Sequence, residues 1–132
     1  MFLSNLNDTE KEVFCKLANI IACIDGVVPE ELNSLSLYNR EMGTNFSFVN
    51  NPKDSVDDLI NQISKSSEKN KKIIAFELIG LAHADADYSQ NEMKAVTEIC
   101  FKLNIDPNKQ RNMEKLVKNI LEMYSEAAEL LK

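Results

Sequence analysis

Apolar residues recur every three or four positions through most of the chain, the spacing that gathers them on one face of an α-helix. The first two runs are separated by a segment that begins with an Asp-Gly pair, and the later runs are separated by polar segments. The pattern predicts an all-α protein. Its helices are expected at about residues 10–24, 29–42, 56–63, 70–84, 90–103 and 106–131.

Residues that favour helix ends stand at the limits of these runs. The cluster at residues 7–9 (Asn-Asp-Thr) offers an N-cap, and Ser89 with Glu92 has the spacing of a capping box. Gly26, Gly43 and Asn104 stand where helices must stop, because these residue types readily adopt left-handed backbone angles. These signals support the helix limits that the apolar spacing predicts.

A short sequence pattern occurs twice. Residues 20–26 (IIACIDG) align with residues 80–86 (GLAHADA) at an offset of 60, and Met42-Gly43 aligns with Leu103-Asn104 at an offset of 61. Each copy is a helix, a turn led by Asp, and a second helix. The repeat predicts two related helical hairpins, at about residues 8–43 and 70–104, and a C-terminal helix at about 106–131. We expect residues 1–132 to form a single-domain bundle of about six or seven helices.

Composition narrows the class of protein. The chain has 132 residues, of which 44% are hydrophobic, and its 15 Lys and Arg face 21 Asp and Glu, a net charge of -6. Such an acidic chain is not expected to bind nucleic acid, because proteins bind it mostly through Lys and Arg side chains that neutralise its phosphates. No apolar run is long enough to cross a bilayer, and no basic segment precedes Phe2 to make a signal peptide. We therefore expect a cytoplasmic protein without membrane insertion.

The three cysteines fit a reducing compartment. Cys15, Cys23 and Cys100 are odd in number, form no Cys-x-x-Cys pair, and stand inside apolar helical patterns. Buried cysteines of this kind behave as small hydrophobic residues. The single histidine, His83, stands on a mostly apolar helix, where a packed or hydrogen-bonded side chain is more usual than a metal ligand.

Negative charge is concentrated in the two inter-helix turns. Residues 25–31 and 85–92 each contain three acids and no base. Hard cations such as Ca²⁺ and Mg²⁺ prefer oxygen ligands of this kind. The same acids could instead only shape helix ends and interact with the helix dipoles. The candidate metal ligands are Asp25, Glu31, Asp85, Asp87 and Glu92.

Both turns resemble a known signature. Residues 20–32 (IIACIDGVVPEEL) and 81–93 (LAHADADYSQNEM) are similar to the paired Ala-x-Ala-Asp-Gly-x-x-Ser-x-x-Glu motif of the TerB-like family, named for tellurite resistance. The resemblance implies an all-helical fold, an association with stress response, and metal-ion binding. It places the family's acidic positions on Asp25 and Glu31 in the first turn and on Asp85 and Glu92 in the second.

The loop at residues 44–53 is the longest break in the helical pattern. Its Phe46 and Phe48 could form an exposed patch that binds a partner protein, or they could fold back over the core. An enzyme is the least expected class, because the chain has one His, no Gly-rich phosphate loop and no zinc-type spacing. Two hypotheses therefore stand: a domain that binds Ca²⁺ or Mg²⁺ weakly, and a protein–protein interaction module.

Overall fold

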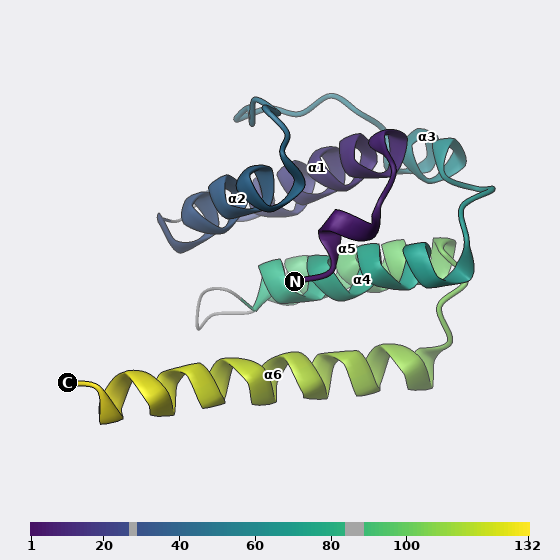
Figure 1. The fold of residues 1–132 in the computed structure, drawn as a ribbon. Helices are drawn as coiled ribbons and strands as arrows, with labels where there is room; N and C mark the ends of the chain where they lie inside the picture. Colours follow the sequence, from purple (N-terminus) through teal and green to yellow (C-terminus); the bar gives the residue numbers. More distant parts are fainter. Residues whose placement is uncertain (27–28, 84–88) are drawn as a thin grey trace.

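The structure is a computed structural model, and it describes residues 1–26, 29–83 and 89–132; at positions 29–32 and 34 it describes the backbone alone. The described residues form α-helices and one short 3-10 helix, without strands, which confirms the all-α prediction (Figure 1). In chain order the elements are η1 (Leu3–Asn5), α1 (Asp8–Ala22), α2 (Pro29–Met42), α3 (Val56–Gln62), α4 (Glu68–Ala82), α5 (Gln90–Lys102) and α6 (Pro107–Leu130).

Helix α4 is the centre of the bundle. It contacts α1, α5, α6 and η1, and α1 in turn contacts α2, α3 and α5. The sequence explains this position, because α4 is apolar on most of its faces and must be covered on several sides. Its buried apolar residues are Ile73, Ile74, Ala75, Leu78, Ile79, Leu81 and Ala82.

Most helix ends form as the sequence predicts. The Asn7 side chain accepts from the N–H of Glu10, and the Glu10 side chain accepts from the N–H of Asn7, a complete capping box. Ser55, Ser67, Ser89 and Asp106 cap α3, α4, α5 and α6. Gly26, Gly43 and Asn104 have positive φ angles of 85°, 68° and 61°.

Several predicted limits differ from the structure by one or two residues, and two of these differences have a clear cause. The first helix ends at Ala22 rather than near residue 24, because the N–H of Ile24 bonds to the carbonyl of Ile21 and the last turn tightens. Helix α4 begins at Glu68 rather than near residue 70, since Ser67 caps it. Residues 68 and 69 therefore belong to the first turn of α4 rather than to the polar segment before it.

The segment before α1 belongs to the core, which the sequence pattern did not indicate. Leu3 and Leu6 are buried. The N–H of Phe2 donates to the Glu77 carboxylate at 2.9 Å, and the N–H of Leu3 donates to that of Glu41 at 2.8 Å. A three-residue helix is too short to show a period, so only these tertiary contacts reveal it.

Helix α6 differs from the others. It has 24 residues, of which only Val117 is buried. In Figure 1 its yellow end extends beyond the end of α4. No helix among the described residues has the length and the apolar character that crossing a membrane requires.

Candidate functional site

Asp25, the leading acid of the first turn, lies at the start of α5. The Ser89 hydroxyl donates to one carboxylate oxygen of Asp25, and Nδ2 of Asn91 donates to the other at 3.2 Å. Asp25 and Ser89 are 64 positions apart in the chain. These hydrogen bonds join the turn of the first hairpin (residues 8–43) to the start of the second helix of the other hairpin (residues 70–104).

Glu92 lies on the inner side of the same group. Glu92 is buried, with only 4% of its surface exposed. Its N–H donates to the Ser89 oxygen at 3.1 Å, as expected for the cap of α5. The Ser89 oxygen also lies 3.5 Å from Oε1 of Glu92. Ser89 therefore stands between a buried carboxylate and the exposed carboxylate of Asp25. We call Asp25, Ser89, Asn91 and Glu92 the turn junction.

The hydrogen bonds of the turn junction favour the ionised carboxylate of Asp25. The hydrogen bonds from Ser89 and then from Asn91 hold the pKa of Asp25 below its usual 3.8. The amino-terminal end of α5 adds a partial positive charge next to Glu92. Both features stabilise negative charge and account for acids at this position without any bound ion.

The remaining predicted ligands lie outside the described residues. This is true of Asp85 and Asp87 altogether, and of the Glu31 side chain, although its backbone is in α2. Within the described part of the chain, no three His, Cys, Asp or Glu residues are placed so that they could hold a metal ion. The described oxygen ligands are therefore those of the turn junction. The sequence analysis identified Ser89 only as a cap and did not single out Asn91.

Phe46 and Phe48 pack on each other and on the core. Their rings meet edge to face with centroids 4.9 Å apart, and both side chains are half-buried against the hydrophobic core. Asn39 fixes this loop, since its Nδ2 donates to the carbonyl of Phe46 at 2.9 Å and its Oδ1 accepts from the N–H of Phe46 at 3.1 Å. The pair folds back over the core, and a partner-binding role for it stays a prediction.

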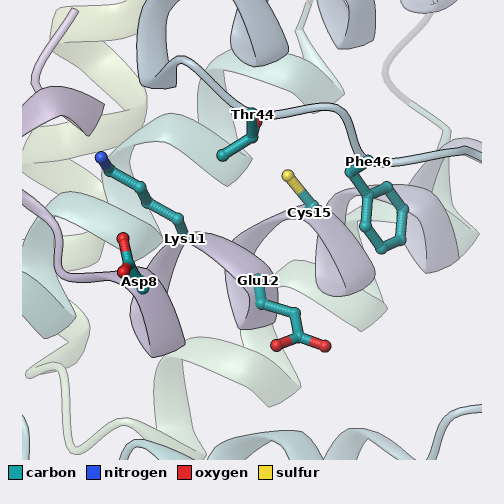
Figure 2. Close-up of a pocket in the computed structure, with 6 residues that line it drawn as sticks. All are labelled: Asp8, Lys11, Glu12, Cys15, Thr44 and Phe46. Atoms are coloured by element: carbon teal, nitrogen blue, oxygen red, sulfur yellow. The ribbon is translucent and has the colours of Figure 1, made fainter.

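A small pocket of about 290 Å³ opens beside Phe46, between α1 and the loop after α2 (Figure 2). Cys15 is the one thiol in its lining. Burial raises the pKa of the Cys15 thiol to about 11, so the thiol is protonated near neutral pH. Lys11 donates to the carbonyl of Met42 at 3.2 Å. This arrangement stabilises the fold and does not activate the thiol.

His83, at the end of α4, is hydrogen-bonded as the sequence analysis expected. Its Nε2 lies 2.7 Å from Oε2 of Glu114 on α6, and both side chains are partly buried. This contact anchors the amino-terminal half of α6 to the centre of the bundle.

The carboxy-terminal half of α6 presents apolar side chains to solvent. Every residue from 121 to 132 is exposed. A groove of about 500 Å³ runs along this half, and it is lined by Met1, Ile120, Met123, Tyr124 and Ala127. We call the exposed apolar side of residues 116–131 the α6 face. Its large exposed residues are Leu116, Met123, Tyr124, Leu130 and Leu131, whereas Leu121, nine positions before Leu130, is exposed on the opposite side of the helix.

No family model, curated protein or solved structure matches the chain. The resemblance to the TerB-like family therefore rests on the two turn sequences and stays a prediction.

Proposed function

We propose that this chain is a non-enzymatic, TerB-like helical domain that binds a divalent cation weakly where its two acidic turns meet. One observation supports the proposal. The Ser89 oxygen lies next to the carboxylates of both Asp25 and Glu92, which brings three oxygen-bearing side chains together. A cation bound among these oxygens would be attracted by both negative charges, with Ser89 as a further oxygen ligand.

The chemistry of the turn junction points to Ca²⁺ or Mg²⁺. Carboxylate, hydroxyl and amide oxygens are hard ligands, and Asp25 is exposed, so an ion can reach it from solvent. Few charged ligands and the adjacent positive end of α5 limit the affinity. We expect a Kd on the order of 10⁻⁴–10⁻³ M, as in weak calcium modules. A role in stress response or tellurite resistance would follow from the family resemblance alone.

Thermal unfolding with and without the ion tests this proposal. An ion at about 10 mM that binds only the folded chain with this Kd stabilises it by roughly 1.4–2.7 kcal/mol. For a domain of this size, that raises the Tm by about five to ten degrees. Sodium chloride at about 30 mM, the same ionic strength, measures the part of the rise that comes from screening.

Two variants separate site binding from general charge effects. Asp25→Asn keeps the shape of the side chain and removes one ligand charge, so the ion should raise the Tm of this variant little more than sodium chloride does. Asp54→Asn removes one charge from an exposed loop position outside both the turn junction and α6, and should respond like the parent. An equal response of Asp25→Asn and the parent would show that the acids act only at helix ends.

A second candidate function, a protein–protein interaction module, is favoured by the α6 face. Large contiguous apolar surfaces are rare on monomeric proteins and mark interaction sites. Leu130 and Leu131 are each 85% exposed, and Met123 is 68% exposed. Burial of these side chains by a partner would be favourable, because each large apolar side chain contributes about 1.5–3 kcal/mol when it leaves water.

A further inference from the structure

The apolar seam of α6 has a regular period that continues past the bundle. Its members stand alternately four and three positions apart, which is the heptad spacing of helices that pack side by side. Val117 is buried and Met113 packs on the core, whereas Tyr124, Ala127 and Leu131 are exposed. The full series is Met113, Val117, Ile120, Tyr124, Ala127 and Leu131.

The charges of α6 are divided between its two halves. The first half, residues 107–118, has four bases and one acid, and that acid, Glu114, is paired with His83. Residues 119–131 have three acids and no base. The bases are Lys109, Arg111, Lys115 and Lys118, and the acids are Glu122, Glu126 and Glu129.

This order of charges is the reverse of what an isolated helix favours. The helix dipole stabilises acids near the amino end and bases near the carboxy end. In α6 the first turn has no acid and the last turn has no base. A second helix running antiparallel would place bases opposite acids along the whole length, whereas a parallel one would place like charges together.

We propose that the α6 face binds a second copy of this chain, with the two α6 helices packed antiparallel about a twofold axis near their middle. This inference rests on the second candidate function, an interaction role for α6, and is independent of cation binding. In such a symmetric pair each copy offers the same surface, so both exposed ends are covered at once.

The surface beside the first half of α6 is suited to the acidic end of the second copy. A shallow groove of about 440 Å³ lies there, with Phe2, Ile73, Phe76 and Met113 in its apolar lining. Lys69 and Lys72 complete the lining. An incoming α6 end with exposed leucines and three glutamates matches this groove in both polarity and charge.

The exposed apolar area is large enough for a stable pair. Seven large apolar residues on this side of α6 and in the two grooves beside it together expose the equivalent of about four and a half whole side chains, on the order of 800 Å². A standard specific interface buries roughly 800 Å² on each partner. The seven are Met1, Phe2, Leu116, Met123, Tyr124, Leu130 and Leu131.

Sedimentation velocity of the full chain over a range of concentrations tests the pair. We expect a dimer that dissociates on dilution. Met123→Glu with Leu130→Glu should raise the dissociation constant by about a hundredfold or more, since hot-spot apolar residues dominate interfaces. Phe101→Glu places the same charge on an exposed apolar residue of α5, 79% exposed, and should leave the dimer intact. A parent chain that stays monomeric at all concentrations would overturn the proposal.

Charge exchange tests the antiparallel direction. Lys115→Glu with Lys118→Glu should weaken the dimer about tenfold, and so should Glu122→Lys with Glu126→Lys, because each creates like charges across several symmetry-related contacts. All four changes together restore opposite charges in an antiparallel pair and should recover the affinity. No recovery, or no loss from either set alone, would contradict the antiparallel arrangement.

Labelling of a cysteine introduced at position 123 distinguishes two negative results: that the chain does not dimerise, and that the α6 face is not available to any partner. In a dimer, Met123→Cys should react with a maleimide more slowly as concentration rises, with the parent chain as the background. A monomer whose Cys at 123 reacts freely would exclude self-association but leave the α6 face open to another protein. A monomer in which this thiol is protected would show that α6 packs on its own bundle, and both ideas would fail.

Discussion

Asn19 of α1 and Val49 of the loop after α2 exchange two hydrogen bonds. Nδ2 of Asn19 donates to the carbonyl of Val49 at 2.8 Å, and the N–H of Val49 donates to Oδ1 of Asn19 at 2.8 Å. Asn19 is only 2% exposed and lies in an otherwise apolar helix face. The Asn19 side chain therefore pairs with the backbone of Val49 and holds the loop against the bundle.

Asn19→Ala is expected to destabilise the fold by about 2–3 kcal/mol, because it removes two buried hydrogen bonds at about 1 kcal/mol each and leaves a small void. Chemical denaturation at neutral pH measures the change. Asn51→Ala, at an exposed position of the same loop, is the matched control and should be nearly neutral. Equal stabilities of the two variants would mean that the loop does not depend on Asn19.

The repeat predicts that Ile21 and Leu81 occupy equivalent buried positions, and both are 0% exposed. Truncation of either to Ala should cost about 2–5 kcal/mol through lost burial and the cavity that remains. Leu37→Ala removes the same atoms from a residue that is 56% exposed on α2 and should cost much less. A small effect at position 21 or 81, measured by thermal melts, would contradict the equivalence of the two hairpins.

Much of the fold could be predicted from the sequence because its determinants are local. The three- and four-residue spacing of apolar positions predicted the helices, and capping residues such as Asn7 and Ser89 predicted where two of them begin. The burial of η1 was not predictable in this way. It depends on Glu41 and Glu77, which are distant in the chain and accept hydrogen bonds from the backbone of residues 2 and 3.

The candidate site could be predicted only in part. Composition singled out Asp25 and Glu92, but their approach to each other depends on how the two hairpins pack, and no local pattern encodes that. The exposure of the α6 face could not be predicted from a local pattern either. Tyr124 and Val117 stand at equivalent positions of one apolar seam, yet the bundle covers only Val117.

The cysteines should differ in reactivity according to their surroundings. Burial raises the pKa of the Cys15 thiol to about 11 and that of Cys100 to about 12, so neither provides appreciable thiolate near pH 8. Cys23 is only half-buried. Mass spectrometry after brief alkylation of the native chain should find Cys23 modified first and the other two only after unfolding. Equal modification of all three in the native chain would show that α1 and α5 open readily.

The hydrogen bonds of Asp25 predict a specific dependence of stability on pH. Ser89 and Asn91 lower the pKa of Asp25 in the folded chain below 3.8, its usual value. Such a group stabilises the fold at pH values above its unfolded pKa, and this contribution is lost as the pH falls through the lowered folded pKa.

Asp25→Asn should therefore melt slightly below the parent near pH 6, by on the order of one or two degrees, since exposed contacts of this kind are weak. Near pH 2 the parent carboxyl is itself protonated and resembles the amide, so the difference between the two melting temperatures should disappear. Asp54→Asn, whose exposed carboxylate lies outside both the turn junction and α6, controls for the change in net charge. A gap between Asp25→Asn and the parent that stays constant from pH 6 to pH 2 would mean that the ionised carboxylate does not join the two hairpins. Asp25 would then act through its shape alone, and the cation site proposed at the turn junction would lose its exposed ligand.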